Sequence, residues 1–177
     1  VGFIANLKGE ASHDILDKAI TGLKNLAHRG AIDADAVTGD GSGVMTQIPY
    51  ALYRRHLESI GMKLYREEDL AVATLFIPRD EDYVIARAKR VVEEAVKQEG
   101  MNFLCWREVP VEPDCLGQKA ERTRPAILQA LIARGEDCDD DVFERRCFLA
   151  TKASERQAAE DKLEGFYLCS FSSRTIT

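Results

Sequence analysis

A long stretch of helical periodicity, from Asp80 to Glu99, limits what this chain can fold into. Apolar residues recur there at three- and four-residue steps: Val84, Ala88, Val91, Val92, Ala95 and Val96. Charged residues fall on the opposite side, and Gly100 follows as a natural helix end. Such a helix is stable in a protein mainly because its apolar face is buried. The rest of the chain must therefore supply an apolar surface for it to cover.

Strand-like segments supply that surface. Short runs of β-branched, aromatic and other apolar residues predict strands over residues 1–7, 44–48, 70–77, 103–111, 127–133 and 166–177. We predict further helices from Ser12 to about Arg29, from Pro49 to Ile60, and from the acidic run 137–141 to Lys162. The order lacks a regular alternation of strand and helix, which favours an α+β layered domain over a doubly wound parallel sheet.

The chain is long enough for one globular domain. Its 177 residues are 45% hydrophobic, no internal repeat is present, and the nearest segment to a linker is the loop predicted at residues 110–123. Trp106 and Leu116 near that loop suggest that it packs against a core. We therefore predict a single domain over residues 1–177. The last strand-like segment stops at Thr177 without a turn signal, so we expect the domain to be a fragment.

Charge and cysteine content exclude several functions. The chain has 30 acidic and 24 basic residues, and it lacks the clustered basic face that binding to nucleic acid requires. No apolar run is long enough to span a bilayer and no signal sequence opens the chain, which predicts a cytoplasmic protein that does not bind membranes. The five cysteines are odd in number and widely spaced, which predicts reduced thiols and no metal site. A metal cluster of Cys115, Cys138 and Cys147 with a histidine is the less favoured alternative.

A glycine-rich segment, GDGSG, contains Gly39, Asp40, Gly41 and Gly43. It lacks the Gly-Lys-Ser/Thr ending of a Walker loop, and a strand-like segment follows it where a dinucleotide-binding loop would open a helix. We therefore interpret it as a hairpin turn in which glycine supplies the positive φ.

Arg29, with Gly30 directly after it, is the best candidate for a binding residue. A guanidinium at a helix end offers a forked donor for a carboxylate, and the glycine lets a ligand approach the backbone closely. The alternative is that Arg29 interacts with the negative end of its own helix, or pairs with Asp33 or Asp35. We expect the neighbouring His28 to cap carbonyl groups or to pack rather than to transfer protons.

No internal catalytic motif is recognisable. The acidic run 137–141 is not a calcium loop, because Val142 stands where glycine is required and Phe148 where the last carboxylate ligand is required. The sequence has no GxSxG elbow and no HExxH helix. We therefore expect any chemistry to lie near the N-terminus.

Four motifs, taken in order, resemble the glutamine amidotransferase domain of the large subunit of glutamate synthase. They are VGFIA at residues 1–5, LAHRGA at 26–31, GDGSG at 39–43 and FSSRTI at 171–176. Other class II amidotransferases share the opening strand and the Arg-Gly turn. The GDGSG and SSRTI forms are most similar to glutamate synthase.

The resemblance implies an N-terminal nucleophile fold, a four-layer α/β/β/α sandwich with two antiparallel sheets between helical layers. It also implies hydrolysis of glutamine to glutamate and ammonia. In the family, an N-terminal Cys thiolate attacks the side-chain amide, its own α-amine acts as base, ammonia leaves, and water releases glutamate from the thioester. Ammonia would then pass to a synthase domain of the same polypeptide or of a partner subunit. There it would join 2-oxoglutarate, with electrons supplied by FMN and an iron–sulfur cluster; no cofactor is implied within this chain.

Carried over by position, Arg29 matches the arginine beside the nucleophile, where its charge orders the site and favours the thiolate. Gly30 would line the substrate site. Gly39, Asp40, Gly41 and Gly43 would form its turn scaffold.

The resemblance places the nucleophile outside residues 1–177. Val1 matches the third residue of the mature family sequence, so we expect a Cys-Gly pair upstream of it. We expect the oxyanion-hole Asn-Gly pair and the acidic residue that binds the substrate amine beyond Thr177. A polypeptide of these residues alone is therefore predicted to be inactive. Two alternatives remain: a non-catalytic structural or interaction module on the same scaffold, and an amidotransferase domain that feeds ammonia to a different acceptor.

Overall fold

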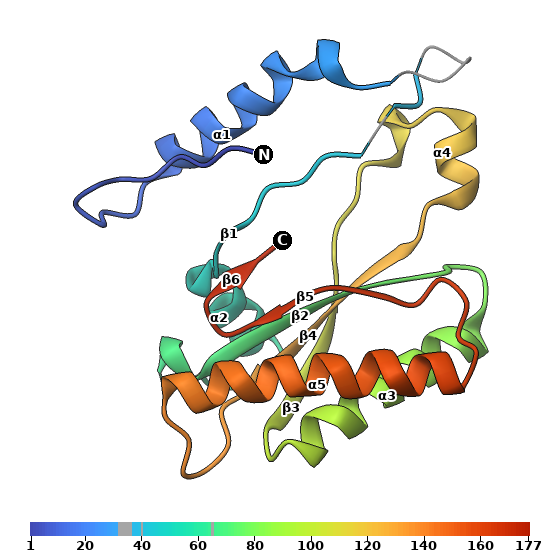
Figure 1. The fold of residues 1–177 in the computed structure, drawn as a ribbon. Helices are drawn as coiled ribbons and strands as arrows, with labels where there is room; N and C mark the ends of the chain where they lie inside the picture. The colour runs from blue at the N-terminus through green and yellow to red at the C-terminus, as the bar shows by residue number, and fades with distance from the viewer. Residues whose placement is uncertain (32–36, 40, 65) are drawn as a thin grey trace. The chain divides into compact units, whose positions relative to one another are not determined.

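The computed structural model describes residues 1–31, 37–39, 41–64 and 66–177 (Figure 1). They form two compact units, one of Val1–Thr46 with Glu112–Arg122 and one of Gln47–Val111 with Thr123–Thr177. Helices are combined with antiparallel strands, so the predicted α+β class is confirmed. A single domain over residues 1–177 stays a prediction.

A four-stranded antiparallel sheet forms the centre of the second unit. Its strand order is β3-β4-β2-β5, with β2 (Leu70–Ile77), β3 (Asn102–Glu108), β4 (Ala126–Ala133) and β5 (Tyr167–Ser172). β2 and β4 pair along their whole lengths, from Leu70 opposite Ala133 to Ile77 opposite Ala126. The strands predicted at 70–77 and 127–133 are therefore confirmed.

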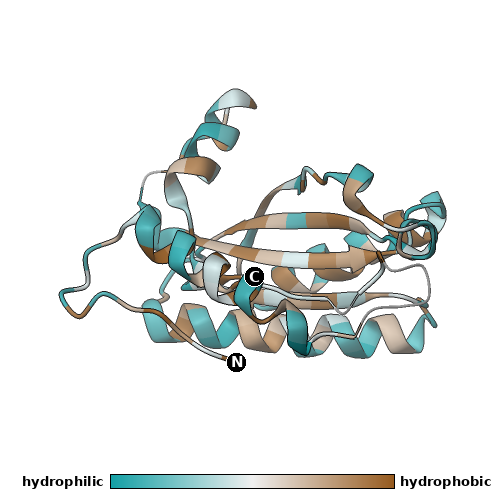
Figure 2. Cartoon of the chain, turned by 90° about the horizontal axis from the view of Figure 1, so that it is seen from above, coloured by the Kyte–Doolittle hydropathy of each residue, from teal (hydrophilic) through white to brown (hydrophobic). Residues whose placement is uncertain are grey.

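Two long helices, α3 (Asp82–Gln98) and α5 (Asp140–Glu160), cover one face of this sheet (Figure 1). The face of α3 that is buried contains Ala88, Val91, Val92, Ala95 and Val96, as its periodicity predicted. Gly100 ends this helix with a φ of +68°, and the Met101 N–H donates to the Val96 carbonyl over 3.0 Å. The Asp139 carboxylate caps α5 by accepting from the Val142 N–H over 2.8 Å. Figure 2 shows apolar strands and a long α5 in which apolar and polar residues alternate.

The opposite face of the sheet packs against α2 (Tyr50–Ser59). Pro49 is the N-cap of α2, and Gly61 follows its end with a φ of +79°, close to the predicted limits. This second core contains Ile48, Tyr53, Leu57, Leu70, Val72, Leu131 and Ile176. A short 3₁₀ turn, η2 (Glu67–Asp69), leads into β2.

The first unit contains α1 (His13–Asn25), followed by the 3₁₀ turn η1 (Ala27–Arg29). The hydroxyl of Ser12 caps α1 as predicted, accepting from the Asp14 N–H over 3.2 Å. None of the residues of α1 is fully buried, so its apolar stripe has no core of its own in this unit. The unit also contains η3 (Pro113–Cys115) and most of α4 (Gln118–Thr123), while β1 (Thr46–Gln47) lies at the boundary.

The prediction of a strand over residues 1–7 was wrong. The segment has no regular secondary structure, and Phe3 and Leu7 are fully exposed. A short apolar run by itself establishes neither burial nor pairing, because a strand needs a hydrogen-bonded neighbour. For the same reason, the strand predicted at 44–48 is reduced to the two residues of β1.

Two other predictions need correction. The loop predicted at 110–123 contains η3 and α4, which are too short to give a periodic signal. The terminal strand predicted over 166–177 is interrupted between β5 and β6 (Thr175–Ile176). The Ser172 hydroxyl accepts hydrogen bonds there from the N–H groups of Arg174 (2.9 Å) and Thr175 (3.2 Å). Such side-chain bonds to the backbone compete with strand pairing.

A test of the packing in the second unit is the substitution Gly135→Ala. A Cβ atom at Gly135 would lie 1.8 Å from the Gly100 carbonyl oxygen, so the backbone must move. We expect the free energy of unfolding to fall by about 1–3 kcal/mol, the usual cost of overpacking. Urea unfolding followed by circular dichroism measures this. Gly22→Ala is the control, because nothing lies within 4 Å of that position, and it should not destabilise the chain.

A second test uses the ion pair between α3 and the end of α5. The Nε of Arg87 donates to the Asp161 carboxylate over 2.5 Å, and this bond holds the pKa of that carboxyl below its ordinary value of 3.8. The pair therefore stabilises the fold above pH 3.8, and its contribution is lost as the pH falls through the lower folded-state pKa. We expect the difference in urea midpoint between the wild type and Asp161→Asn to shrink from pH 6 to pH 2. A difference that grew on acidification would contradict this; Glu160→Gln is the control.

Candidate functional site

Arg29 is the last residue of η1, at the point where the chain leaves the helical region. Its N–H donates to the Leu26 carbonyl over 2.9 Å, and the Gly30 N–H donates to the Ala27 carbonyl over 3.1 Å. Gly30 then continues in an extended conformation, with φ −82° and ψ 150°. These bonds end the helical turn and place the Arg29 side chain on the exposed surface of its unit.

The guanidinium of Arg29 is not engaged by the part of the chain that the structure describes. No side-chain hydrogen bond or ion pair joins it to any described residue. Asp33 and Asp35, the alternative partners considered from the sequence, lie outside the described residues. The site therefore offers a guanidinium that can donate two hydrogen bonds to a carboxylate ligand or stabilise a neighbouring anion.

His28 has a structural role. Its Nδ1 lies 3.0 Å from the carbonyl oxygen of Asn25, within hydrogen-bonding distance at the end of α1. The prediction that His28 caps a carbonyl is confirmed. This interaction orients the turn that carries Arg29.

The structure brings the Arg-Gly segment close to the start of the glycine-rich segment. A Cβ atom at Gly39 would lie 3.3 Å from the carbonyl oxygen of Ala31, which is tighter than nine in ten real Cβ contacts. Gly39 therefore permits a close approach of two backbone segments that are eight positions apart. Nothing lies within 4 Å of the corresponding position at Gly41.

The hairpin turn predicted at the glycine-rich segment is not found among the described residues. Neither Gly39 nor Gly41 adopts a positive φ, and no regular structure occurs from Gly41 to Met45. Asp40 lies outside the described residues. The glycine at position 39 is required for close approach instead, a role that composition cannot distinguish from a tight turn.

The five cysteines differ in their burial. All five are free thiols, as predicted. Burial raises the pKa of Cys105, and it raises that of Cys147 much further. The exposed Cys115 donates to the carbonyl of Glu112 over 3.1 Å. Among the described residues, no group of three His, Cys, Asp or Glu side chains could hold a metal ion.

A carboxylate that the sequence did not single out organises the FSSRTI motif. Glu144, on α5, accepts hydrogen bonds from the Ser172 hydroxyl (2.7 Å), the Ser173 hydroxyl (2.6 Å) and the Ser173 N–H (2.8 Å). On the other side of the bend, the Tyr50 hydroxyl lies 3.4 Å from the Ser173 carbonyl oxygen. Glu144 precedes Ser172 by 28 positions, so no local pattern could have indicated it.

A second polar group lies on the face of the sheet that α2 covers. The Gln129 amide oxygen accepts from Tyr53 over 3.2 Å and from Arg107 over 2.9 Å. Burial raises the pKa of Tyr53 to about 12, so its hydroxyl remains a donor at neutral pH. These polar groups satisfy one another, which indicates a structural role.

Comparison with known protein families gives one match that spans the chain. The family model of class-II glutamine amidotransferases matches residues 1–177. The matched range includes Arg29, Gly30 and the glycine-rich segment. None of the helices in the described residues is long and apolar enough to cross a membrane.

Several curated proteins are similar to this chain over 99% of its length. A ferredoxin-dependent glutamate synthase 2 from Synechocystis sp. is 40% identical over 177 residues, which are 11% of that protein. A glutamate synthase (NADPH) large chain from Azospirillum brasilense is 34% identical over 176 residues, which are 12% of it. A chloroplastic ferredoxin-dependent glutamate synthase 2 from Arabidopsis thaliana is 37% identical, over 11% of its length. The chain thus spans only about a ninth of these relatives.

The close approach of Gly39 to Ala31 can be tested directly. We expect Gly39→Ala to displace the Ala31 carbonyl by a few tenths of an ångström and so to shift the amide NMR signals of residues 28–31. Gly41→Ala is the matched control and should leave those signals unchanged, because its added methyl group enters open space. Equal effects from the two substitutions would contradict the described geometry.

Proposed function

This chain belongs to the class-II glutamine amidotransferases, and on that premise we propose that it forms part of the glutamine-hydrolysing domain of a glutamate synthase. The observation that carries this proposal is the family match over residues 1–177, together with glutamate synthases 34–40% identical over 99% of the chain. The guanidinium of Arg29, which is exposed and has no side-chain partner among the described residues, is compatible with that role.

The proposed reaction is the hydrolysis of the side-chain amide of glutamine. A cysteine thiolate, expected upstream of Val1, attacks the amide carbon, and the C–N bond breaks as the nitrogen takes up a proton and leaves as ammonia. Water then attacks the thioester, which releases glutamate and regenerates the thiol. Arg29 contributes a fixed positive charge that favours the thiolate and can hold a substrate carboxylate, while Gly30 leaves room for the substrate beside the backbone.

We propose that the ammonia passes to a synthase region of the same polypeptide or of a partner subunit, where glutamate is formed reductively. The names of the relatives give ferredoxin and NADPH as electron sources for those proteins. The described residues do not fit an iron–sulfur cluster, because their cysteines are dispersed and Cys147 lies in the apolar core. We therefore place FMN and the cluster outside residues 1–177.

We also propose a cytoplasmic location. The name of the Arabidopsis relative gives a chloroplast location for that protein. Cell fractionation distinguishes the two locations.

The role of Arg29 is tested in the protein encoded by the complete reading frame. We expect Arg29→Ala to lower kcat/KM for glutamine hydrolysis about 10- to 100-fold, since a hydrogen bond to a charged group contributes roughly 1.5–3 kcal/mol. Removing a cation that favours the thiolate raises the thiol pKa, so the rising limb of the pH–rate profile should move to higher pH. Arg29→Lys retains the charge, so its pH–rate profile should lie close to that of the wild type. Ammonia release measured from pH 5 to pH 9 gives both quantities.

Lys24→Ala is the matched control, because it removes an exposed cation from the last turn of α1. A polypeptide of residues 1–177 alone is the negative control and should release no ammonia. An unchanged pH profile in Arg29→Ala would remove Arg29 from the site. A complete protein that does not hydrolyse glutamine would favour the alternative of a non-catalytic module. Hydrolysis without glutamate synthesis would indicate a different ammonia acceptor.

A further inference from the structure

Helix α5 carries large apolar side chains on its solvent side as well as on its buried side. Its buried residues are Phe143, Cys147, Ala150, Ser154 and Ala158. On the opposite side, Phe148 is 58% exposed and Leu149 is 43% exposed. In α3, the neighbouring helix, Tyr83 is the large apolar residue that is exposed. Phe148 and Leu149 are adjacent in the helix, so they expose a small apolar surface that another part of a protein could contact.

Basic residues flank this apolar pair. The flanking residues are Arg145, Lys152 and Arg156. The first two lie three or four positions from the apolar pair, and Arg156 lies four positions after Lys152, so all three share its side of the helix. The Nζ of Lys152 lies 5.7 Å from the centre of the Phe148 ring and 2.7 Å from the Glu155 carboxylate. Neither Arg145 nor Arg156 has a side-chain partner among the described residues.

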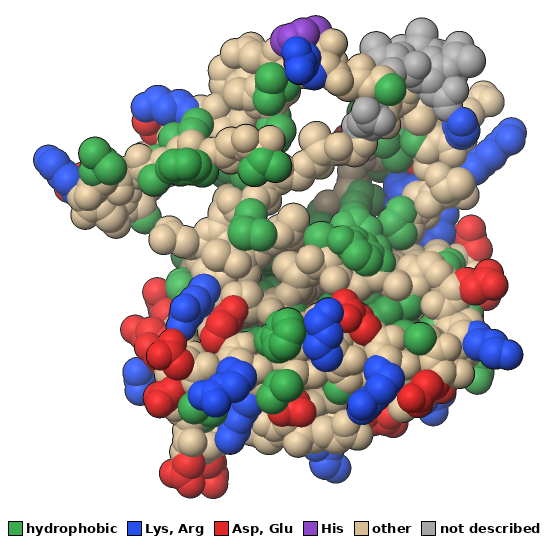
Figure 3. Space-filling model, viewed as in Figure 1, with side chains coloured by type: hydrophobic (Ala, Val, Ile, Leu, Met, Phe, Trp, Pro, Cys, Tyr) green, Lys and Arg blue, Asp and Glu red, His purple; other side chains and the backbone are tan. Residues whose placement is uncertain are grey.

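The charge of this stripe is opposite to that of the whole chain, which has a net charge of −6. Figure 3 shows the face that includes α5, where hydrophobic side chains lie among basic and acidic ones. A stripe of apolar groups with cationic flanks is complementary to a protein surface that presents apolar side chains among carboxylates.

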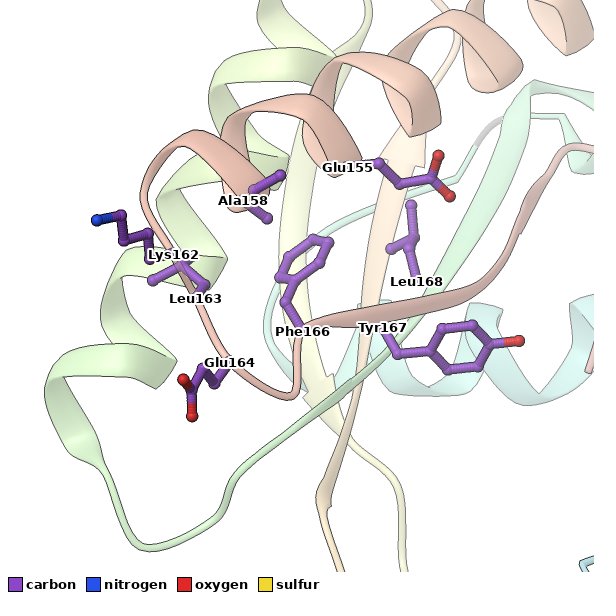
Figure 4. A pocket seen from close by; sticks show the side chains of 9 residues that line it. Glu155, Ala158, Lys162, Leu163, Glu164, Phe166, Tyr167 and Leu168 are labelled. Carbon is purple, nitrogen blue, oxygen red and sulfur yellow. The ribbon is translucent and has the colours of Figure 1, made fainter.

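A cavity of about 380 Å³ opens at the C-terminal end of the same stripe. Steps of four, three and four residues along α5 lead from Phe148 through Lys152 and Glu155 to Ala159, so these residues lie in one row. Glu155 and Ala159 line the cavity. Its other lining residues are Ala158, Lys162, Leu163, Glu164, Phe166, Tyr167 and Leu168. Figure 4 shows the Phe166 ring pointing into it, with Leu163, Ala158 and Leu168 around it and Glu155 nearby. The cavity is therefore an apolar recess continuous with the basic and apolar stripe.

We propose that this stripe and cavity form the docking surface for the ammonia-consuming part of the complete polypeptide, through a region that presents carboxylates around an apolar side chain. The inference rests on the proposed function, in which ammonia made at one site is used at another and the two parts must be held together. Carboxylates of the docked region pair with Arg145 and Arg156, and its apolar side chain enters the cavity beside Phe166. The glutamate synthases that this chain resembles are about nine times its length, which leaves ample chain for such a region.

The test is photocrosslinking in the protein encoded by the complete reading frame. Phe148 is replaced by p-benzoylphenylalanine, which keeps an aromatic ring at that position. We expect irradiation to give an intramolecular crosslink, and mass spectrometry of the peptides to place its other end outside residues 1–177 in an Asp- and Glu-containing segment. The matched control is the same replacement at Tyr83, which is 74% exposed on α3 and should give no such crosslink.

A functional readout accompanies the crosslink. We expect Arg145→Glu with Arg156→Glu to raise the share of ammonia that escapes to solvent by roughly threefold or more, because like charges weaken the docking. The rate of glutamine hydrolysis should not change, since neither residue belongs to the glutamine site. Arg90→Glu, on the exposed side of α3, is the matched control and should not alter the escape.

Three outcomes would overturn the inference: no crosslink from position 148, a crosslink to a second copy of the polypeptide, or unchanged ammonia escape in the double variant. Failure of the proposed function is a separate result, because the unmodified protein would then show no glutamine hydrolysis. The crosslinking result does not depend on activity and can be read in either case.

Discussion

Burial of β2 on both of its faces is the constraint on which the second unit depends. Every residue of this strand except Phe76 is buried, and its two edges are paired with β4 and β5. Ala71, Ala73, Leu75 and Ile77 face the core formed with α3 and α5, while Leu70 and Val72 face the core formed with α2. Both cores include side chains of this one strand. The helices α3 and α5 therefore pack on one face of β2, and α2 packs on its other face. The small Ala71 and Ala73 allow the helices to approach the sheet closely.

The long helix α5 then links this core to features at the surface. Its buried side packs on the sheet, and the Glu144 carboxylate holds the bend between β5 and β6 through three hydrogen bonds. Its solvent side presents the basic and apolar stripe. One rigid helix therefore fixes the position of a sequence motif and supports an exposed surface, and a rigid support lets a docking surface keep its shape.

Elements with long repeats were predictable from the sequence. The apolar positions of α3 and the glycine after it defined that helix within a few residues. Ser12 and the acidic run 137–141 marked the starts of α1 and α5, and the structure identifies Asp139 as the cap within that run. The prediction failed where a short segment needs a partner. Residues 1–7 have the composition of a strand but are unpaired in this structure, and the Ser172 hydroxyl interrupts the terminal strand. In the candidate site, Arg29 and Gly30 could be chosen from motif and residue chemistry. The role of Gly39 could not, because it depends on the carbonyl of Ala31 in space.

The sequence by itself determined the helices with repeated apolar spacing, the strands that are mostly apolar, and the family, because these depend on residues near one another in the chain or on ordered motifs. Only the tertiary structure decided which segments pair, which of two similar glycines lies close to another backbone segment, and that Glu144 binds Ser172 and Ser173. It also decided that Phe148 and Leu149 face solvent. These are contacts between distant residues, and their free energies depend on burial and geometry that exist only after the chain has folded.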